Sequence, residues 1–184
     1  MRQLIITEFI SLDGVMEAPG GEPGYAHSGW VGRRFSDELG AYKLEEQLAA
    51  DILLLGRVTY ESFYGAWPER EGEMAEKINT MTKVVASTTI DSSDWTDTTV
   101  VADPISEVKE LKAGDGGPIL VAGSRTLAQA LLAAGLVDQL NLQVFPFVLG
   151  SGARLFPDSP DLLELTLSSS RAIDGGVVLQ SYTL

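Results

Sequence analysis

The sequence contains no cysteine and a single histidine, His27. The absence of cysteine excludes disulfides, thiolate zinc sites, iron–sulfur clusters and a cysteine nucleophile, and it is typical of a reducing compartment, so we expect a cytoplasmic protein. A transition-metal site would depend mainly on carboxylates, and no ligand spacing indicates one. Because G-x-S-x-G is absent and His27 stands alone in a long loop, a serine hydrolase is not indicated.

Positive charge and long apolar runs are also scarce. Lys and Arg number 13 against 26 Asp and Glu, for a net charge of −13 and a sequence pI near 4.3. This balance excludes electrostatic tracking of nucleic acid. The longest nearly apolar run, about 144–149, is far shorter than the roughly 20 residues of a membrane span. The first ten residues are interrupted by Glu8 and do not indicate a signal peptide.

What remains is the composition of an ordinary globular protein, with 45% hydrophobic and 21% charged residues in 184. This length predicts one domain over 1–184. Strands are predicted at 2–10, 52–55, 83–86, 98–102, 119–122 and 138–149, with a terminal hairpin of 163–173 and 177–184. Helices are predicted from Ser36, from Thr59, over 69–81, from Pro104 to about 112 and from Ser124 to Gly135.

This alternation predicts an α/β fold: a mixed, mostly parallel sheet with helices on both faces and an antiparallel C-terminal hairpin. Ligands of such sheets bind at the carboxyl ends of the strands. The glycine-rich stretch 11–32 follows the first strand and is long for a connection within a compact domain. Loops of that length are often functional.

Three strand ends carry residues suited to phosphates. They are Gly56-Arg57 with Thr59, the hydroxyl pair Ser87-Thr88, and the run Gly123-Ser124-Arg125-Thr126. Glycine allows close backbone approach, helix N-termini present free amides, and arginine pairs with phosphate. Each is also compatible with an ordinary turn, with Arg57 in a surface ion pair. Together they favour a ligand with several phosphates, such as a dinucleotide.

The same residues carry a family resemblance over nearly the whole chain. Its motifs are Ser11-Leu12-Asp13-Gly14, the run 54–61 (LLGRVTYE), and the block 119–156, with AGLVDQL at 134–140 and PFVLG at 146–150. The sequence resembles the dihydrofolate reductase superfamily, in the branch of the C-terminal reductase domain of the riboflavin-biosynthesis deaminase-reductase.

This resemblance implies NADPH as cofactor. It carries phosphate contacts onto Gly56, Arg57 and Thr59, and proximity to the 2′-phosphate onto Ser87 and Thr88. Gly123 and Ser124 would back the pyrophosphate and nicotinamide, followed by Arg125 and Thr126. Ser11, Asp13 and Gly14 would form the base of a lid over the nicotinamide and substrate.

The resemblance also has departures. Riboflavin-pathway reductases commonly carry lysine and glutamate where this chain has Val15 and Ala122. Folate enzymes place a carboxylate early in the first helix, a region that Asp37 or Glu38 occupies here. Asp37 is kept as the candidate acid, although a carboxylate there is commonly a helix cap.

The prediction is therefore a reductase that moves hydride from NADPH to a C=N or C=O bond of a pterin- or pyrimidine-like heterocycle. Its alternatives are a non-catalytic NADPH or nucleotide sensor, and an assembly dimer that keeps the fold without the pocket. An exposed sheet edge and the resemblance both favour a homodimer.

Overall fold

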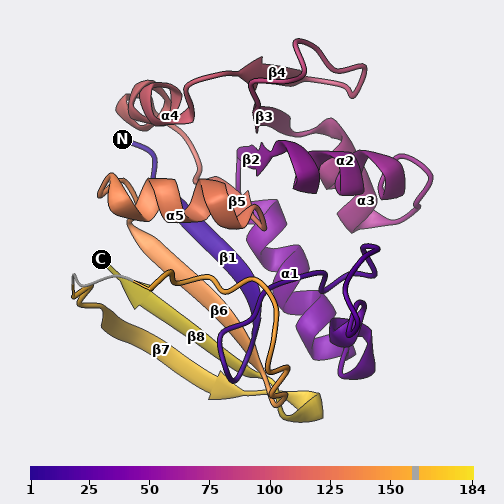
Figure 1. Ribbon diagram of the computed structural model, residues 1–184. Coiled ribbons are helices and arrows are strands. Elements are labelled where there is room, and N and C mark those ends of the chain that lie inside the picture. The colour runs from indigo at the N-terminus through magenta and orange to yellow at the C-terminus, as the bar shows by residue number, and fades with distance from the viewer. Residues whose placement is uncertain (159–161) are drawn as a thin grey trace.

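A computed structural model describes residues 1–158 and 162–184, and its centre is an eight-stranded sheet. The strand order is β4-β3-β2-β5-β1-β6-β8-β7 (Figure 1). The strands are β1 (Leu4–Ser11), β2 (Ile52–Gly56), β3 (Thr82–Ala86), β4 (Thr98–Val101), β5 (Ile119–Ala122), β6 (Gln139–Phe145), β7 (Thr166–Ala172) and β8 (Val178–Thr183). The first six are parallel, whereas β8 pairs antiparallel with β6 on one side and with β7 on the other. The predicted fold class is confirmed.

The described part of the chain contains five α-helices: α1 (Asp37–Ala49), α2 (Arg57–Ala66), α3 (Glu73–Thr80), α4 (Pro104–Ala113) and α5 (Arg125–Ala133). Short 3₁₀ turns occur at η1 (Trp30–Arg33) and η2 (Asp174–Gly176). The Ser36 hydroxyl caps α1 by accepting from the Leu39 amide, and Asp103 caps α4 in front of Pro104. Both starts were predicted from these capping residues.

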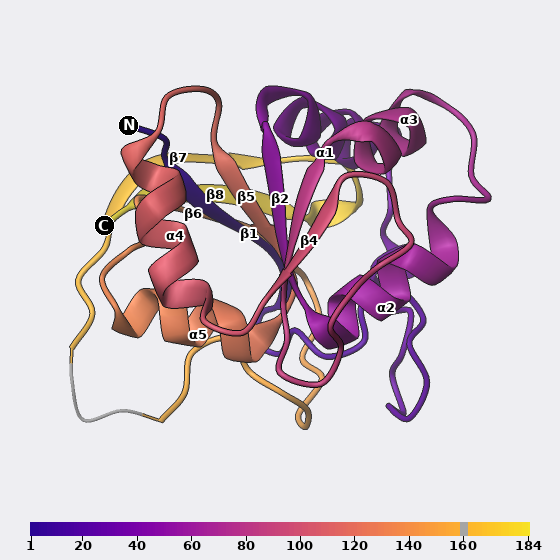
Figure 2. The same ribbon diagram turned by 90° about the horizontal axis from the view of Figure 1, so that it is seen from above.

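The helices form two layers around the sheet, as Figure 2 shows for α1 and α3 on one side and α4 and α5 on the other. Val108 of α4 and Leu127 of α5 pack with Leu4 and Ile6 of β1 in the largest core cluster. The opposite face packs against the other helices, for example through Ile78 of α3. The interior strands are therefore buried on both sides, which is typical of parallel sheets.

Several predicted boundaries need correction. The helix predicted over 69–81 is shorter, because Gly72, with φ of 101°, precedes its first residue. Strand β6 ends at Phe145 and not near 149, because Pro146 has no amide hydrogen to continue the ladder. In the hairpin, β7 begins at Thr166 rather than 163.

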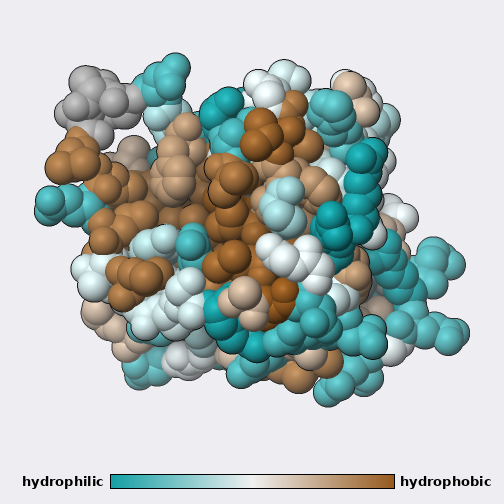
Figure 3. Space-filling model, turned by 90° about the horizontal axis from the view of Figure 1, so that it is seen from below, coloured by the Kyte–Doolittle hydropathy of each residue, from teal (hydrophilic) through white to brown (hydrophobic). Residues whose placement is uncertain are grey.

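At one edge of the sheet, β7 is exposed along its whole length. Exposed leucines lie on it and in the segments beside it, among them Leu163, Leu167 and Leu184. The underside of the molecule, where Figure 1 places β7, carries a band of apolar surface (Figure 3). Among the described residues, no helix is both long and apolar enough to cross a membrane.

The strand order brings several of the predicted site residues together where the carboxyl ends of the parallel strands lie, which is called the carboxyl edge below. Strands β2, β5 and β1 are neighbours and parallel, so the turns after Gly56, Ala122 and Ser11 lie at the same end. This is the edge at which ligands of open α/β sheets bind.

Candidate functional site

Ser124 joins the two glycine turns at this edge. Its Oγ accepts from the Gly56 amide at 2.6 Å and donates to Thr59 Oγ1 at 2.8 Å. The turn after β5 is thereby held against the turn after β2, although 65 residues separate Ser124 from Thr59. The structure thus brings together Gly56, Thr59, Gly123 and Ser124, as one phosphate site requires.

This contact depends on close backbone approach and an unusual conformation. Gly123 and Ser124 are both left-handed, with φ of 69° and 68°. A Cβ on Gly123 would lie 3.0 Å from Thr59 Cγ2, and one on Gly56 would lie 2.9 Å from Ser124 Oγ. Ser124 bears the cost of a left-handed conformation that favours glycine, and such strain is common at binding sites.

The two helices that begin at this contact have no side-chain cap. Within the described residues, Gly56 before α2 has no side chain to cap its helix, and the Ser124 hydroxyl before α5 bridges the two turns instead of capping. The first amides of an α-helix lack partners within the helix and attract anions. Two adjacent N-termini of this kind could hold the phosphates of a dinucleotide, so the residues present fit NADPH.

Three further candidates lie at these helix starts on the surface. Arg57 is the first residue of α2 and pairs with Glu61, its Nη1 lying 2.9 Å from both carboxylate oxygens. The pair is partly exposed, so exchanging it for a phosphate costs little. Arg125 and Thr126 begin α5 and are exposed. All three remain candidates for contact with a ligand.

The hydroxyl pair after β3 lies in a separate hollow of about 250 Å³ at the same end of the sheet, beside β4. Ser87 Oγ accepts from the amides of Thr89 and Ile90, whereas Thr88 is exposed. Asp91 also lines this hollow. The negative charge of Asp91 would repel a 2′-phosphate bound in this hollow. Asp91 was not among the residues predicted from the sequence.

Ser11, Asp13 and Gly14 form a rigid turn at the base of the long loop. Ser11 Oγ donates to Asp13 Oδ1 at 2.6 Å, and the Asp13 carboxylate also accepts from the amides of Leu149 and Gly150. These bonds, led by the one from Ser11, lower the Asp13 pKa to about 2. The side chains of Ser11 and Asp13 therefore tie the loop after β1 to the loop after β6.

Aromatic side chains anchor the same loop. Tyr25 donates to the Ser151 carbonyl at 2.6 Å, and Trp30 Nε1 donates to the Glu17 carbonyl at 2.8 Å. Trp30 is buried edge-to-face against Phe145. These contacts pack the loop against the segment that follows β6 and against Phe145.

Asp37 is the first residue of α1 and is exposed. Because α1 follows the long loop, its N-terminus faces the carboxyl edge of the sheet (Figure 1). Its neighbour Glu38 is engaged with Arg171 and with the Asp174 amide. No hydrogen bond within the described residues links Asp37 to the glycine turns, so its role as an acid stays a prediction.

Glu8 was not predicted as a site residue, yet it is a buried ionisable group next to the turn that follows β5. Glu8 lies in β1 and is only 4% exposed. Burial raises its pKa from 4.5 to about 8 against the opposing effects of Lys43 and the Gly123 backbone. The sequence signal for this residue is a lone carboxylate within the apolar run of β1.

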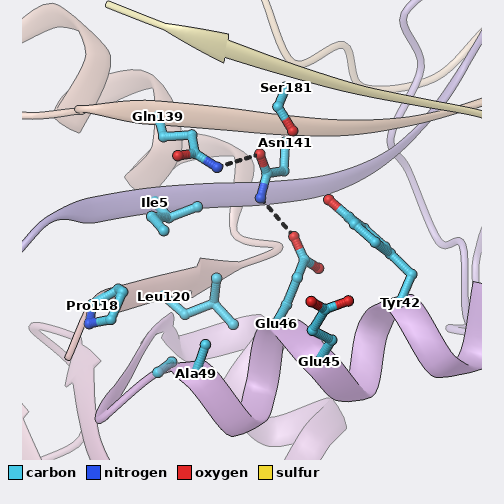
Figure 4. A pocket seen from close by; sticks show the side chains of 11 residues that line it. Ile5, Tyr42, Glu45, Glu46, Ala49, Pro118, Leu120, Gln139, Asn141 and Ser181 are labelled. Atoms are coloured by element: carbon cyan, nitrogen blue, oxygen red, sulfur yellow. Dashed lines mark hydrogen bonds between the residues drawn. The ribbon is translucent and has the colours of Figure 1, made fainter. Parts of the chain in front are cut away.

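A second cavity lies near α1, away from the carboxyl ends of the strands. It has a volume of about 250 Å³ and lies between α1 and the strands β1, β5 and β6, near Pro118 at the amino end of β5 (Figure 4). Its polar wall is satisfied internally, because Glu46 accepts from Asn141 at 2.8 Å and Asn141 accepts from Gln139 at 2.9 Å. We assign the site to the carboxyl edge, where uncapped helices and exposed arginines offer binding groups. In residues 1–158 and 162–184, no cluster of acidic and histidine side chains could hold a metal.

The chain has a dihydrofolate reductase-like fold, with two glycine turns at the carboxyl ends of neighbouring parallel strands. The family model described as "RibD C-terminal domain" matches residues 2–179. The chain belongs to that family, as the motifs predicted.

Individual proteins that resemble the chain share only low sequence identity with it. The chain is 27% identical over 183 residues to the uncharacterized protein YyaP of Bacillus subtilis (strain 168), covering 96% of this chain and 92% of that one. A putative riboflavin biosynthesis protein from Shewanella sp. PV-4 superimposes with a TM-score of 0.76 at 19% identity, over 98% of both chains. A pyrimidine reductase-like protein from Corynebacterium diphtheriae gives 0.66 at 13%, over 99% and 91%. At these identities, the similarity to the two solved structures shows the fold alone.

Proposed function

We propose that this protein is an NADPH-dependent reductase that transfers hydride to a C=N or C=O bond of a pyrimidine- or pterin-like heterocycle, in the manner of the reductase of riboflavin biosynthesis. The observation that carries this proposal is the pair of uncapped helix N-termini, α2 and α5, joined through Ser124. Membership of the RibD C-terminal family, and structural neighbours described as riboflavin biosynthesis and pyrimidine reductase-like proteins, support the same reading.

In this proposal the chain binds and orients the cofactor. The first amides of α2 and α5 hold the pyrophosphate, with Thr59, Ser124 and Thr126 beside them. Arg57 and Arg125 supply positive charge that the acidic protein otherwise lacks near its ligand. Ser87 and Thr88 face the adenosine end, where the exposed Thr88 hydroxyl is free to bind.

The cofactor supplies the hydride when bound, and the protein contributes alignment and exclusion of water. Asp13 ties the loop after β1 to the loop after β6, and in this proposal the loop after β1 covers the bound nicotinamide and substrate. Asp37 at the start of α1 is the proposed source of the proton for the reduced substrate.

A second candidate function is binding of NADPH without turnover. It is favoured by Val15 and Ala122, which replace the lysine and glutamate expected from the resemblance. The phosphate site is the same in both readings, and only the chemistry differs.

The test is oxidation of NADPH, followed by its absorbance, with a panel of aminopyrimidine, pterin and dihydropterin substrates. The proposal predicts substrate-dependent oxidation that falls sharply in Arg57→Ala at limiting NADPH and in Asp37→Asn at saturating NADPH. Tight NADPH binding with no oxidation across the panel favours binding without turnover. Absence of NADPH binding refutes both proposed functions.

A further inference from the structure

Glu8 is placed where an ionised carboxylate is poorly tolerated. Along β1 it projects to the same face as Leu4, Ile6 and Ile10, which are in the main apolar core. Its partner on the neighbouring strand β6 is Leu142. Within the part of the chain that the structure describes, Glu8 Oε1 is buried and has no hydrogen-bond partner. Buried polar atoms of this kind are rare in folded proteins and call for a specific explanation.

The nearby charges do not compensate this group. Lys43 of α1 attracts it and Glu46 of α1 repels it. The Lys43 amine is already bound to Thr7 Oγ1 and Glu46 Oε2, at 2.6 Å each. Arg125, at the start of α5, is exposed. Burial therefore has the largest effect and raises the Glu8 pKa to about 8, so that the acid is neutral at pH 7.

Glu8 also lies beside the turn of the proposed phosphate site. Thr7 of β1 pairs with Ala122 of β5 in the parallel ladder, so Glu8 and Gly123 are the residues that follow this pair, and the Gly123 backbone lowers the Glu8 pKa against the effect of burial. Gly123 and Ser124 are the two left-handed residues that lead into α5. A negative charge behind this turn would compete with a phosphate for its amides and would repel the phosphate directly.

We propose that Glu8 is a positioning residue of the cofactor site, supporting phosphate binding at the Gly123–Ser124 turn only while it keeps its proton. This inference rests on the proposed function for the identity of the ligand. The neutral acid fills the space behind the turn without adding charge. No proton passes from Glu8 to a substrate, and its effect is on affinity.

The experiment is a calorimetric titration of the full chain with NADPH, and separately with inorganic pyrophosphate, at intervals from pH 6.5 to 9.5. Wild type is compared with Glu8→Gln, a neutral side chain of the same shape, and with Glu110→Gln, which removes an exposed carboxylate of α4. Titration of the phosphates themselves is common to all three proteins and cancels in the comparison.

The expected result is that wild type and Glu110→Gln lose affinity for both probes by about tenfold above pH 8, because a buried unit charge close to a phosphate has at least that effect. Glu8→Gln should stay nearly constant over the same range. Parallel pH profiles for all three proteins would overturn the proposal.

The two proposals fail differently. If NADPH does not bind but pyrophosphate binds with the pH dependence that Glu8→Gln removes, the cofactor assignment is wrong and the role of Glu8 stands. If NADPH binds equally well at all pH values, the role of Glu8 is wrong and the cofactor stands. If neither probe binds, the turn is no phosphate site and both are overturned.

Discussion

Replacing Glu8 by glutamine should change how the stability of the protein depends on pH, even with no ligand present. The Glu8 pKa is about 8 in the folded protein and 4.5 when the side chain is exposed. Between these values the folded state holds a proton that the unfolded state has lost. The stabilisation associated with that proton is complete below about pH 4.5 and is lost as the pH rises to 8.

The magnitude follows from the size of the shift. Each pH unit between the two pKa values removes about 1.4 kcal/mol from the free energy of unfolding. Allowing for partial titration near pH 5, the wild type should lose about 2.5 kcal/mol from this group between pH 5 and pH 7. Glutamine cannot ionise, so the variant escapes this loss.

Urea denaturation at pH 5, 6, 7 and 8 measures the effect directly. The difference between Glu8→Gln and wild type should grow steadily in favour of the variant and level off above pH 8. Glu110→Gln should follow the wild type, because its carboxylate is exposed in the folded protein. A constant difference between Glu8→Gln and wild type from pH 5 to 8 would refute the buried neutral acid.

Four other changes test separate parts of the account. Arg57→Ala should weaken NADPH binding by about tenfold or more and NADH binding less, because a charge-assisted phosphate contact is worth about 1.5–3 kcal/mol; equal losses in calorimetry would refute a contact with the 2′-phosphate. Ser124→Ala should lower the free energy of unfolding by about 2 kcal/mol in urea, because the Gly56 amide loses its acceptor; an unchanged midpoint would contradict the bridge. Asp91→Asn should improve NADPH binding about threefold relative to NADH by removing a like charge from the hollow, whereas an unchanged ratio would place the 2′-phosphate elsewhere. We propose that the exposed strand β7 forms a homodimer, so light scattering should find a dimer for wild type and a monomer for Leu167→Glu, and a monomeric wild type would refute it.

Local chemical signals predicted much of the fold. Ser36 and the Asp103-Pro104 pair mark the starts of α1 and α4 because capping and the fixed proline φ act over a few residues. Gly135, with φ of 63°, lies just after α5 as predicted. Strand order could not be read in this way, because it depends on which distant segments pair.

The candidate site was predicted less completely, for the same reason. The glycine turns were found because Gly56 and Gly123 precede helices in the sequence, yet nothing local indicates that Ser124 bonds to Gly56 and Thr59. Glu8 was missed because its pKa depends on burial by segments far away in the chain. Asp91 was missed because hollows form only when strands are placed side by side.

The measurement that tests the central claim most directly is calorimetric titration of the purified wild-type protein with NADPH and with NADH at pH 7. The account predicts micromolar binding of NADPH to one site per chain, with clear preference over NADH. Failure of both nucleotides to bind would contradict the phosphate site at the α2 and α5 N-termini and, with it, the proposed reductase.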